Sequence, residues 1–382
     1  MPKVKLFEPL PLRGVTLRNR VAVSPMQVYM ADHDGIANDW HLQHLGKFAV
    51  GGAGLVFTEG LIVDPVGRSS YSDCGLWSDE QIAPLRRITD LIRSQGGVAG
   101  AQLHHAGPKA ARRRGWDGFG ALDDTDAAKG EPPWQPVGVS AERSLARYHT
   151  PRPLSDAEVH EVPEMFARAA RRADAAGFEV VEVHAAHGYL IHSFLSPVSN
   201  TRGGPFGGSA TGRMRLALDV ADAVREAWPD DRPLFFRLSC VDGVEDGWTL
   251  DDSVILARAL HERGVDVIDC SSGGIRSATS AGQNAPAGQY APGYQVPYSA
   301  RLRRDAGIAT MAVGLIITAQ QAEDILQRGD AEIVAIGRPA LEEPNWALRA
   351  ARALGADPDR QMWPDPYAWG LRALDAARDG VG

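Results

Sequence analysis

Eight short apolar runs alternate with longer stretches of helical period, and this alternation is the feature that most constrains the fold. The predicted strands cover residues 20–24, 54–59, 98–103, 178–184, 234–239, 265–271, 309–314 and 332–337. The predicted helices cover residues 39–50, 78–94, 155–176, 212–227, 250–263, 296–305, 319–327 and 341–353. Strands that alternate with helices form a parallel sheet with the helices outside it. Eight such units therefore predict an α/β fold, a closed (β/α)8 TIM barrel.

An open, doubly wound sheet is the alternative to the barrel. It is less favoured because no Rossmann glycine fingerprint follows the first strand. The helix at 155–176 has a clear start signal, since Ser155 followed by Glu158 forms a capping box.

Two connections are too long for plain barrel loops. One runs from about 106 to 153, between the third and fourth strands, and the other covers 272–295 after the sixth strand. Both begin at carboxyl ends of strands, where barrel active sites are built. We interpret the first as a lid over the site, with a surface insertion as the alternative. We expect one barrel over residues 1–356, lid included, followed by a tail over 357–382 whose aromatic side chains dock at a subunit interface.

Composition narrows the class of protein. The chain has 40 Lys and Arg against 48 Asp and Glu, a formal charge of −8, which argues against a nucleic-acid-binding surface. No run approaches the ~18 apolar residues of a membrane span, and the first residues lack the apolar segment of a signal peptide. Cys74, Cys240 and Cys270 are too few and too scattered for an iron–sulfur cluster or a disulfide framework. We therefore expect a cytoplasmic enzyme without nucleic-acid or membrane partners.

Candidate site residues, most of them polar, lie at or just after the ends of the predicted strands. Because these ends share one face of a barrel, we expect them to form one site. The residues concerned are Ser24, Pro25, Met26, Gln27 and Tyr29 after the first strand, Gly60 after the second, Gln102 in the third, and His184, His187 and Tyr189 at the fourth.

The cluster of His184, His187 and Tyr189 allows three interpretations. The first is a metal site, which has weak support because no third ligand is apparent nearby in the sequence. Two imidazoles could instead bind a substrate oxygen, with a tyrosine of pKa near ~10 as proton donor. Packing in the core is the third possibility. We favour the second, with no metal bound.

Two further features point to an anionic ligand. Arg237 lies within an apolar strand and needs an anionic partner, from either the protein or a ligand. Gly314, Gly337 and Arg338 end the seventh and eighth strands, where barrels bind phosphate. A plain strand-to-helix turn is the alternative for Gly337 and Arg338.

The motifs together resemble the old yellow enzyme family of FMN-dependent ene-reductases, especially its bacterial thermophilic-like branch. The matching segments are Ser-Pro-Met at 24–26, Ala-Gln-Leu-His-His-Ala-Gly at 101–107, His-Ala-Ala-His-Gly-Tyr-Leu at 184–190, Ser-Pro-Val-Ser-Asn-Thr-Arg at 196–202, Phe-Gly-Gly at 206–208 and Ile-Gly-Arg-Pro at 336–339. They span nearly the whole chain in the family's order.

The resemblance implies roles for these residues. FMN would be bound by Ser24, Pro25, Met26, Gln27, Gly60, Gln102, Arg237, Gly314, Gly337 and Arg338, with the last three at its phosphate. His184 and His187 would bind the carbonyl or nitro oxygen of the substrate, Tyr189 would donate a proton, and Tyr29 would line the substrate pocket. Trp369 would reach the active site of a neighbouring subunit in a homodimer or higher oligomer.

The implied reaction is reduction of the activated C=C bond of an α,β-unsaturated carbonyl compound, with NADPH or NADH as reductant. The departure that matters is Gln27, which stands where the branch usually has a cysteine. A specialised substrate, or the reverse desaturation, is therefore an alternative. An isomerase or lyase without flavin and an idle flavin-binding protein are the competing classes, whereas three scattered cysteines exclude the iron–sulfur relatives.

Overall fold

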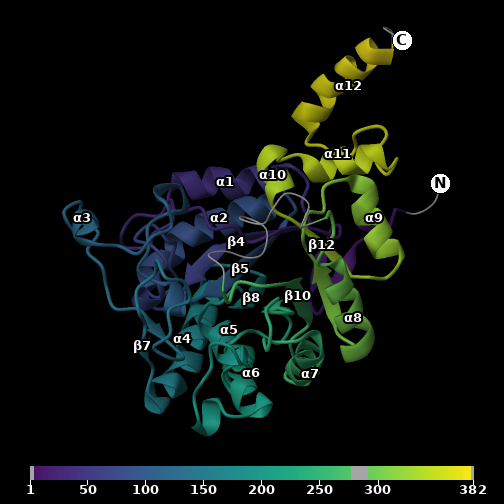
Figure 1. Ribbon diagram of the computed structural model, residues 1–382. Helices are drawn as coiled ribbons and strands as arrows, with labels where there is room; N and C mark the ends of the chain where they lie inside the picture. Colours follow the sequence, from purple (N-terminus) through teal and green to yellow (C-terminus); the bar gives the residue numbers. More distant parts are fainter. Residues whose placement is uncertain (1–3, 277–290, 380–382) are drawn as a thin grey trace.

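A closed barrel of eight parallel strands forms the centre of the molecule (Figure 1). The computed structural model describes residues 4–276 and 291–379. Around the barrel the strand order is β10-β11-β12-β3-β4-β5-β8-β9, so each strand pairs with its chain neighbours and β12 closes onto β3. The strands are β3 (Val21–Val23), β4 (Leu55–Ile62), β5 (Val98–His104), β8 (Val180–Ala185), β9 (Leu234–Ser239), β10 (Val267–Ser271), β11 (Ala309–Ala312) and β12 (Ile333–Ile336). The predicted TIM barrel is confirmed.

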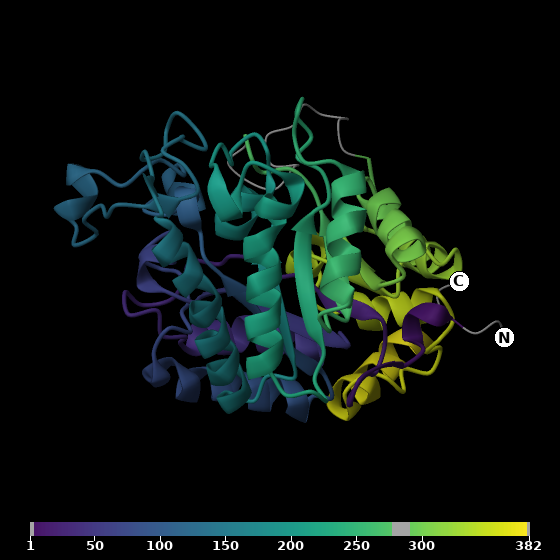
Figure 2. The same cartoon turned by 90° about the horizontal axis from the view of Figure 1, so that it is seen from below.

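Helices cover the outside of the strands, as the view in Figure 2 shows. They are α1 (Asp39–Val50), α2 (Ile82–Ser94), α4 (Asp156–Ala175), α6 (Ala210–Ala227), α7 (Leu250–His261), α8 (Val296–Ala306), α9 (Ala319–Gln327) and α11 (Trp346–Ala353). The capping box before α4 is present. The Glu158 amide donates to Ser155 Oγ at 3.2 Å, and the Ser155 amide donates to the Glu158 carboxylate at 2.8 Å. These bonds satisfy amides that would otherwise lack helical partners.

Apolar side chains plug the barrel at the amino ends of its strands. Phe57 and Phe235 meet there at 5.9 Å between ring centroids, in a cluster that also contains Met311. An antiparallel hairpin, β1 (Leu10–Leu12) with β2 (Val15–Leu17), adds buried residues to this cluster. This hairpin was not predicted. Because this end is filled with apolar side chains, a ligand site is left to the carboxyl ends of the strands.

The long insertion after β5 has two parts. Its first part stays close to the barrel, whereas α3 (Asp124–Ala127) lies at the far edge of the molecule (Figures 1 and 2). Its other elements are η4 (Gly107–Lys109), η5 (Gly115–Asp117), β6 (Val137–Gly138) and β7 (Arg152–Pro153). Of the second predicted long connection, 272–295, residues 277–290 lie outside the described residues.

The C-terminal tail contains a helix, α12 (Asp365–Asp379), which extends away from the barrel (Figure 1). Sequence analysis described this segment only by its aromatic residues. Shorter helices are α5 (Leu190–Leu195), α10 (Arg338–Glu342), η1 (Lys5–Phe7), η2 (Pro65–Gly67), η3 (Asp79–Gln81) and η6 (Gly204–Phe206). Within 4–276 and 291–379, no helix has the length and apolar character needed to cross a membrane.

Candidate active site

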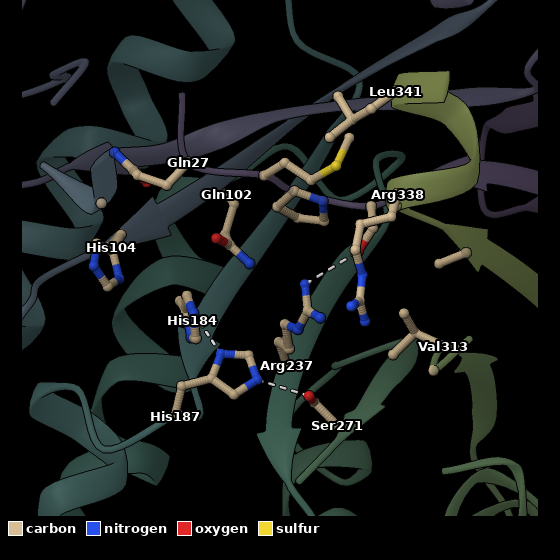
Figure 3. Close-up of a pocket in the computed structure, with 18 of the residues that line it drawn as sticks. Gln27, Gln102, His104, His184, His187, Arg237, Ser271, Val313, Arg338 and Leu341 are labelled. Carbon is tan, nitrogen blue, oxygen red and sulfur yellow. Dashed lines mark hydrogen bonds between the residues drawn. The ribbon is translucent and has the colours of Figure 1, made fainter. Parts of the chain in front are cut away.

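A cavity of about 530 Å³ opens at the carboxyl ends of the barrel strands (Figure 3). This volume lies within the range of small-molecule and cofactor sites. Its lining includes every residue predicted for the site except Trp369: Ser24, Pro25, Met26, Gln27, Tyr29, Gly60, Gln102, His184, His187, Tyr189, Arg237, Gly314, Gly337 and Arg338. The barrel thus brings together residues that are up to about three hundred positions apart.

Two glycines and an arginine form one part of the wall, after β11 and β12. Gly314 has φ +121°, a backbone conformation that favours glycine. A Cβ atom at Gly337 would meet Met26 Sδ at 3.6 Å and Ser24 Cβ at 3.9 Å, so the protein itself crowds this backbone with no atom closer than ordinary van der Waals contact. Arg338 lines the same cavity and makes no ion pair within the described part of the chain. Exposed backbone and a guanidinium without a carboxylate suit a phosphate group.

Arg237, on β9, has a protein partner. Its Nε lies 3.2 Å from Asp269 Oδ2, and its Nη1 donates to Ser24 Oγ at 3.3 Å. The Gln102 amide donates to the neighbouring Glu182 carboxylate at 2.8 Å. Burial raises the pKa of both Glu182 and Asp269, and the two acids face one guanidinium. The sequence did not show whether the anionic partner of Arg237 comes from the protein or from a ligand. The ion pair with Asp269 shows that the protein supplies one such partner.

The side chain of Gln27 is hydrogen-bonded to two buried acidic residues. Its Nε2 donates to Glu59 Oε2 at 2.6 Å and to Asp73 Oδ1 at 3.1 Å, and the other oxygen of Glu59 lies 3.0 Å from His41 Nε2. Burial, reinforced by the charge of Glu59, raises the pKa of Asp73 to about 7. The amide nitrogen of Gln27 is therefore used within the protein.

His184 and His187 contact each other. The Ala186 amide donates to His184 Nδ1 at 3.2 Å, which leaves the proton of a neutral His184 on Nε2. This Nε2 lies 3.2 Å from His187 Nδ1, and His187 Nε2 lies 2.7 Å from Ser271 Oγ (Figure 3). Burial, followed by neighbouring imidazoles and cations, lowers the pKa of both rings well below 6.5. Both are neutral at pH 7.

A buried lysine fixes the turn that carries this cluster. His187 and Gly188 have φ of +60° and +73°. Lys109 Nζ donates to the carbonyl oxygens of His187 at 2.7 Å and Gly274 at 2.5 Å. Sequence analysis missed Lys109, which lies just inside the predicted insertion.

Tyr189 lies beside His104 and Arg112, to which the sequence analysis gave no role. Its ring meets His104 edge-on at 4.3 Å and His184 at 5.0 Å between centroids. Arg112 Nη2 donates to the hydroxyl oxygens of Tyr189 and Tyr29, each at 3.3 Å. Strand alternation offered a signal for His104, since it lies two residues after Gln102 and faces the same side. No comparable signal marked Arg112.

Trp369, the remaining predicted site residue, lies outside the cavity. Its side chain is 81% exposed on α12, and it does not line the cavity of its own chain. A contact with a neighbouring subunit stays a prediction.

Comparisons with known proteins agree with this geometry. The profile of the NADH:flavin oxidoreductase / NADH oxidase family matches residues 5–357. NADPH dehydrogenase from Geobacillus thermodenitrificans is 40% identical over 351 residues, 92% of this chain and 94% of that protein. NADPH dehydrogenase from Listeria innocua is 41% identical over 352 residues, 92% of this chain and 95% of that one.

Solved structures give the same result. Morphinone reductase in complex with tetrahydroNAD superposes with a TM-score of 0.73 at 26% identity, covering 92% of this chain and 91% of that one. The old yellow enzyme homologue from Zymomonas mobilis, at 24% identity, shares the fold with a TM-score of 0.74 over 92% of each chain. The chain therefore belongs to the NADH:flavin oxidoreductase / NADH oxidase family, that of the old yellow enzymes, and is an NAD(P)H-dependent flavin oxidoreductase with FMN as its cofactor.

Proposed function

We propose that this enzyme reduces the activated C=C bond of α,β-unsaturated carbonyl or nitro compounds, with Tyr189 as the proton donor. The observation that carries the proposal is the convergence of His184, His187 and Tyr189 on one wall of the cavity. The ring centroid of His184 lies 5.0 Å from that of each of the other two. Hydrogen-bond donors and a phenol at one place suit a substrate whose oxygen gains charge while a neighbouring carbon gains a proton.

The residues present fit FMN. The part of the cavity lined by Gly337 and by Arg338, which has no carboxylate partner in the described chain, would hold the phosphate. Ser24, Pro25, Met26, Gly60, Gln102 and Arg237 would hold the ring system, and Gln27 would contribute its backbone. When bound, FMN supplies hydride exchange with NAD(P)H and with the acceptor.

His184 would bind the substrate oxygen through Nε2–H. Its Nδ1 accepts from the Ala186 amide, so this proton is fixed on the correct nitrogen. A substrate oxygen would replace the 3.2 Å contact to His187 Nδ1, and His187 would turn its own N–H from Ser271 to the same oxygen. Because burial keeps the pKa of both rings low, they act as neutral donors that polarise the oxygen.

Tyr189 would protonate the α-carbon. Its phenol hydroxyl carries a proton that it can transfer to a carbon on which negative charge develops. Since the Tyr189 oxygen accepts from Arg112 Nη2, its own proton is directed away from the guanidinium. The positive charge of Arg112 also stabilises the phenolate left after proton transfer.

An anaerobic titration tests the proposal. NADPH is added first to the FMN-loaded enzyme, and 2-cyclohexenone second, while flavin absorbance is followed. We expect bleaching with NADPH and recovery of the colour with enone, together with formation of cyclohexanone. An enzyme that is bleached by NADPH but not reoxidised by the enone, or by nitroalkene and enal acceptors tested alongside, contradicts the proposal.

A further inference from the structure

Arg112 places a buried positive charge in the cavity wall without a carboxylate beside it. Its side chain is 2% exposed and lines the cavity. Across residues 4–276 and 291–379, no Asp or Glu oxygen lies within 4.0 Å of its nitrogens, and its Nε has no hydrogen-bond partner. A desolvated charge without a counter-ion destabilises the folded protein. A ligand that supplies the counter-ion would offset part of this destabilisation.

The neighbouring arginines are neutralised. Arg113 pairs with Asp123 at 2.6 Å and with Asp126 at 2.7 Å, and Arg114 pairs with Glu131 at 2.5 Å. In the cavity wall itself, Arg237 has Asp269 at 3.2 Å. Arg112 therefore differs from its chain neighbours, and from the other buried guanidinium of the cavity, in having no acid beside it.

Phenol hydroxyls surround Arg112 instead. Its Nη2 lies 3.3 Å from the hydroxyl oxygens of Tyr29 and Tyr189, and its Nη1 lies 3.2 Å from that of Tyr148. Each oxygen accepts from the guanidinium, so each phenol proton is left to donate elsewhere. Tyr29 and Tyr189 also line the cavity. A guanidinium next to free O–H donors forms a site for an anion.

The nearest buried acids have other partners. Asp73 feels the charge of Arg112, yet burial and Glu59 outweigh it and raise the pKa of Asp73 to about 7. Its oxygens accept from Gln27 Nε2 at 3.1 Å and from the Ser69 amide at 2.5 Å. Glu59 is shared between Gln27 and His41. These contacts leave neither acid as the counter-ion of Arg112.

We propose that Arg112 and Tyr29 form a carboxylate subsite, and that the preferred acceptors are unsaturated carbonyl compounds that carry a carboxylate. The proposal rests on the proposed function, because it defines the class of acceptor for that reaction. In this arrangement His184 binds the carbonyl oxygen, and Arg112 binds the carboxylate in the same cavity. A guanidinium and a carboxylate match in charge and in planar geometry.

A matched pair of acceptors tests the subsite. (E)-4-Oxopent-2-enoate and its methyl ester share the same enone and differ in the charge of one end. The kcat/KM for each is measured with NADPH on the FMN-loaded enzyme and on Arg112→Gln, Arg112→Lys and Tyr29→Phe. Arg113→Gln is the control, because it removes a charge from the adjacent position, where Arg113 pairs with Asp123 and Asp126. Any effect of Arg112 on Tyr189 acts on both acceptors, so the acid-to-ester ratio isolates the subsite.

We expect Arg112→Gln to lower the acid-to-ester ratio by about 10–100-fold, the usual range for a charge-assisted hydrogen bond. Arg112→Lys keeps part of the preference, Tyr29→Phe loses a smaller part, and Arg113→Gln leaves the ratio unchanged. An unchanged ratio in Arg112→Gln overturns the proposal. If that variant does not retain FMN, an unchanged ratio in both Arg112→Lys and Tyr29→Phe overturns it.

A binding measurement separates this proposal from the proposed function. Calorimetry compares the saturated products, 4-oxopentanoate and its methyl ester, on the oxidised enzyme. Tighter binding of the acid, lost in Arg112→Gln, supports the subsite even if neither unsaturated compound is reduced. Equal binding of acid and ester, or no binding of either, contradicts the subsite even if 2-cyclohexenone is reduced.

Discussion

At the scale of single residues, surroundings decide the charge of each group around the cavity. His184 and His187 are neutral because burial holds their pKa well below 6.5. Burial also lowers the pKa of Arg112, but Tyr29, Tyr189 and Tyr148 outweigh it and hold that pKa above its ordinary value. Neutral donors and a permanent cation therefore lie on the same side of the cavity as the phenol of Tyr189.

Tyr189→Phe separates the proton donor from the rest of the site. The ring and its edge-on contact with His104 remain, so FMN binding and reduction by NADPH should be unchanged. Reduction of the enone should slow by about 10²–10⁴-fold, the usual contribution of a general acid. Stopped-flow measurement of the two half-reactions checks this. Enone reduction at the wild-type rate would remove Tyr189 from the role.

His44, on α1, gives a prediction on pH. Its ring stacks on Trp40 at 4.8 Å and meets Phe48 at 5.0 Å. Burial, followed by Lys47 and His41, lowers its pKa to about 4 from a usual value of 6.5. Between these two pH values His44 binds a proton in the unfolded chain but not in the folded protein. Its contribution therefore lowers the free energy of unfolding as pH falls from 6.5 toward 4.

His44→Phe should remove this pH-dependent decrease in the free energy of unfolding while keeping the aromatic contacts. Relative to wild type, the variant should gain roughly 2 kcal/mol of unfolding free energy between pH 7.5 and pH 4.5. Urea unfolding at the two pH values measures the gain, and pH 7.5 serves as the internal control. A difference between the two proteins that is the same at both pH values would refute the assigned shift.

Part of the site was readable from sequence, and part was not. Residues at strand ends were found because a barrel brings those ends to one face. Arg112 was not found, because it is one of three consecutive arginines and nothing local tells which turns inward; Arg113 and Arg114 pair with acids on the insertion. The bond from Gln27 to Asp73 joins segments whose approach only the folded chain determines.

At the scale of elements, the junction between β12 and α10 makes a further prediction. A methyl group at Gly337 meets nothing nearer than 3.6 Å within the protein, yet it enters the space assigned to the FMN phosphate. Gly337→Ala should therefore fold with an unchanged melting temperature as apoprotein. It should bind FMN about tenfold more weakly, equivalent to about 1.4 kcal/mol.

Fluorescence titration of FMN onto the apoprotein measures this effect. Gly203→Ala is the matched control, since a methyl group there meets nothing within 4 Å and lies on a turn that does not line the cavity. Equal FMN affinity in the Gly337 variant and in this control would place the phosphate elsewhere.

Elements were predicted well where they belong to the repeated alternation of strands and helices. The eight barrel strands and α4, with its capping box, are examples. The β1–β2 hairpin was missed because each of its strands has only three residues and, unlike the equally short β3, precedes the repeated alternation of strands and helices. The helix α12 was not predicted; Pro364 and Pro366 lie at its start, and proline is well tolerated in the first turn of a helix.

At the scale of the whole molecule, apolar side chains fill one end of the barrel and a cavity opens at the other end. The helix α12 packs against α11 and extends away from the barrel strands (Figure 1). On this helix the exposed fraction is 81% for Trp369, 51% for Tyr367 and 43% for Leu374. Large apolar side chains that are exposed on one helix are typical of a protein interface. A second copy of this chain is the partner that the resemblance to the old yellow enzymes implies.

We therefore predict a homodimer or higher oligomer in which Trp369 contacts the neighbouring subunit close to its cavity. Light scattering should give at least twice the 41.0 kDa of one chain. Trp369→Ser should shift the protein toward the monomer, or raise the KM for enones severalfold, because the side chain would complete a neighbour's acceptor pocket. A monomeric wild type whose KM is insensitive to this substitution would show that α12 has another role.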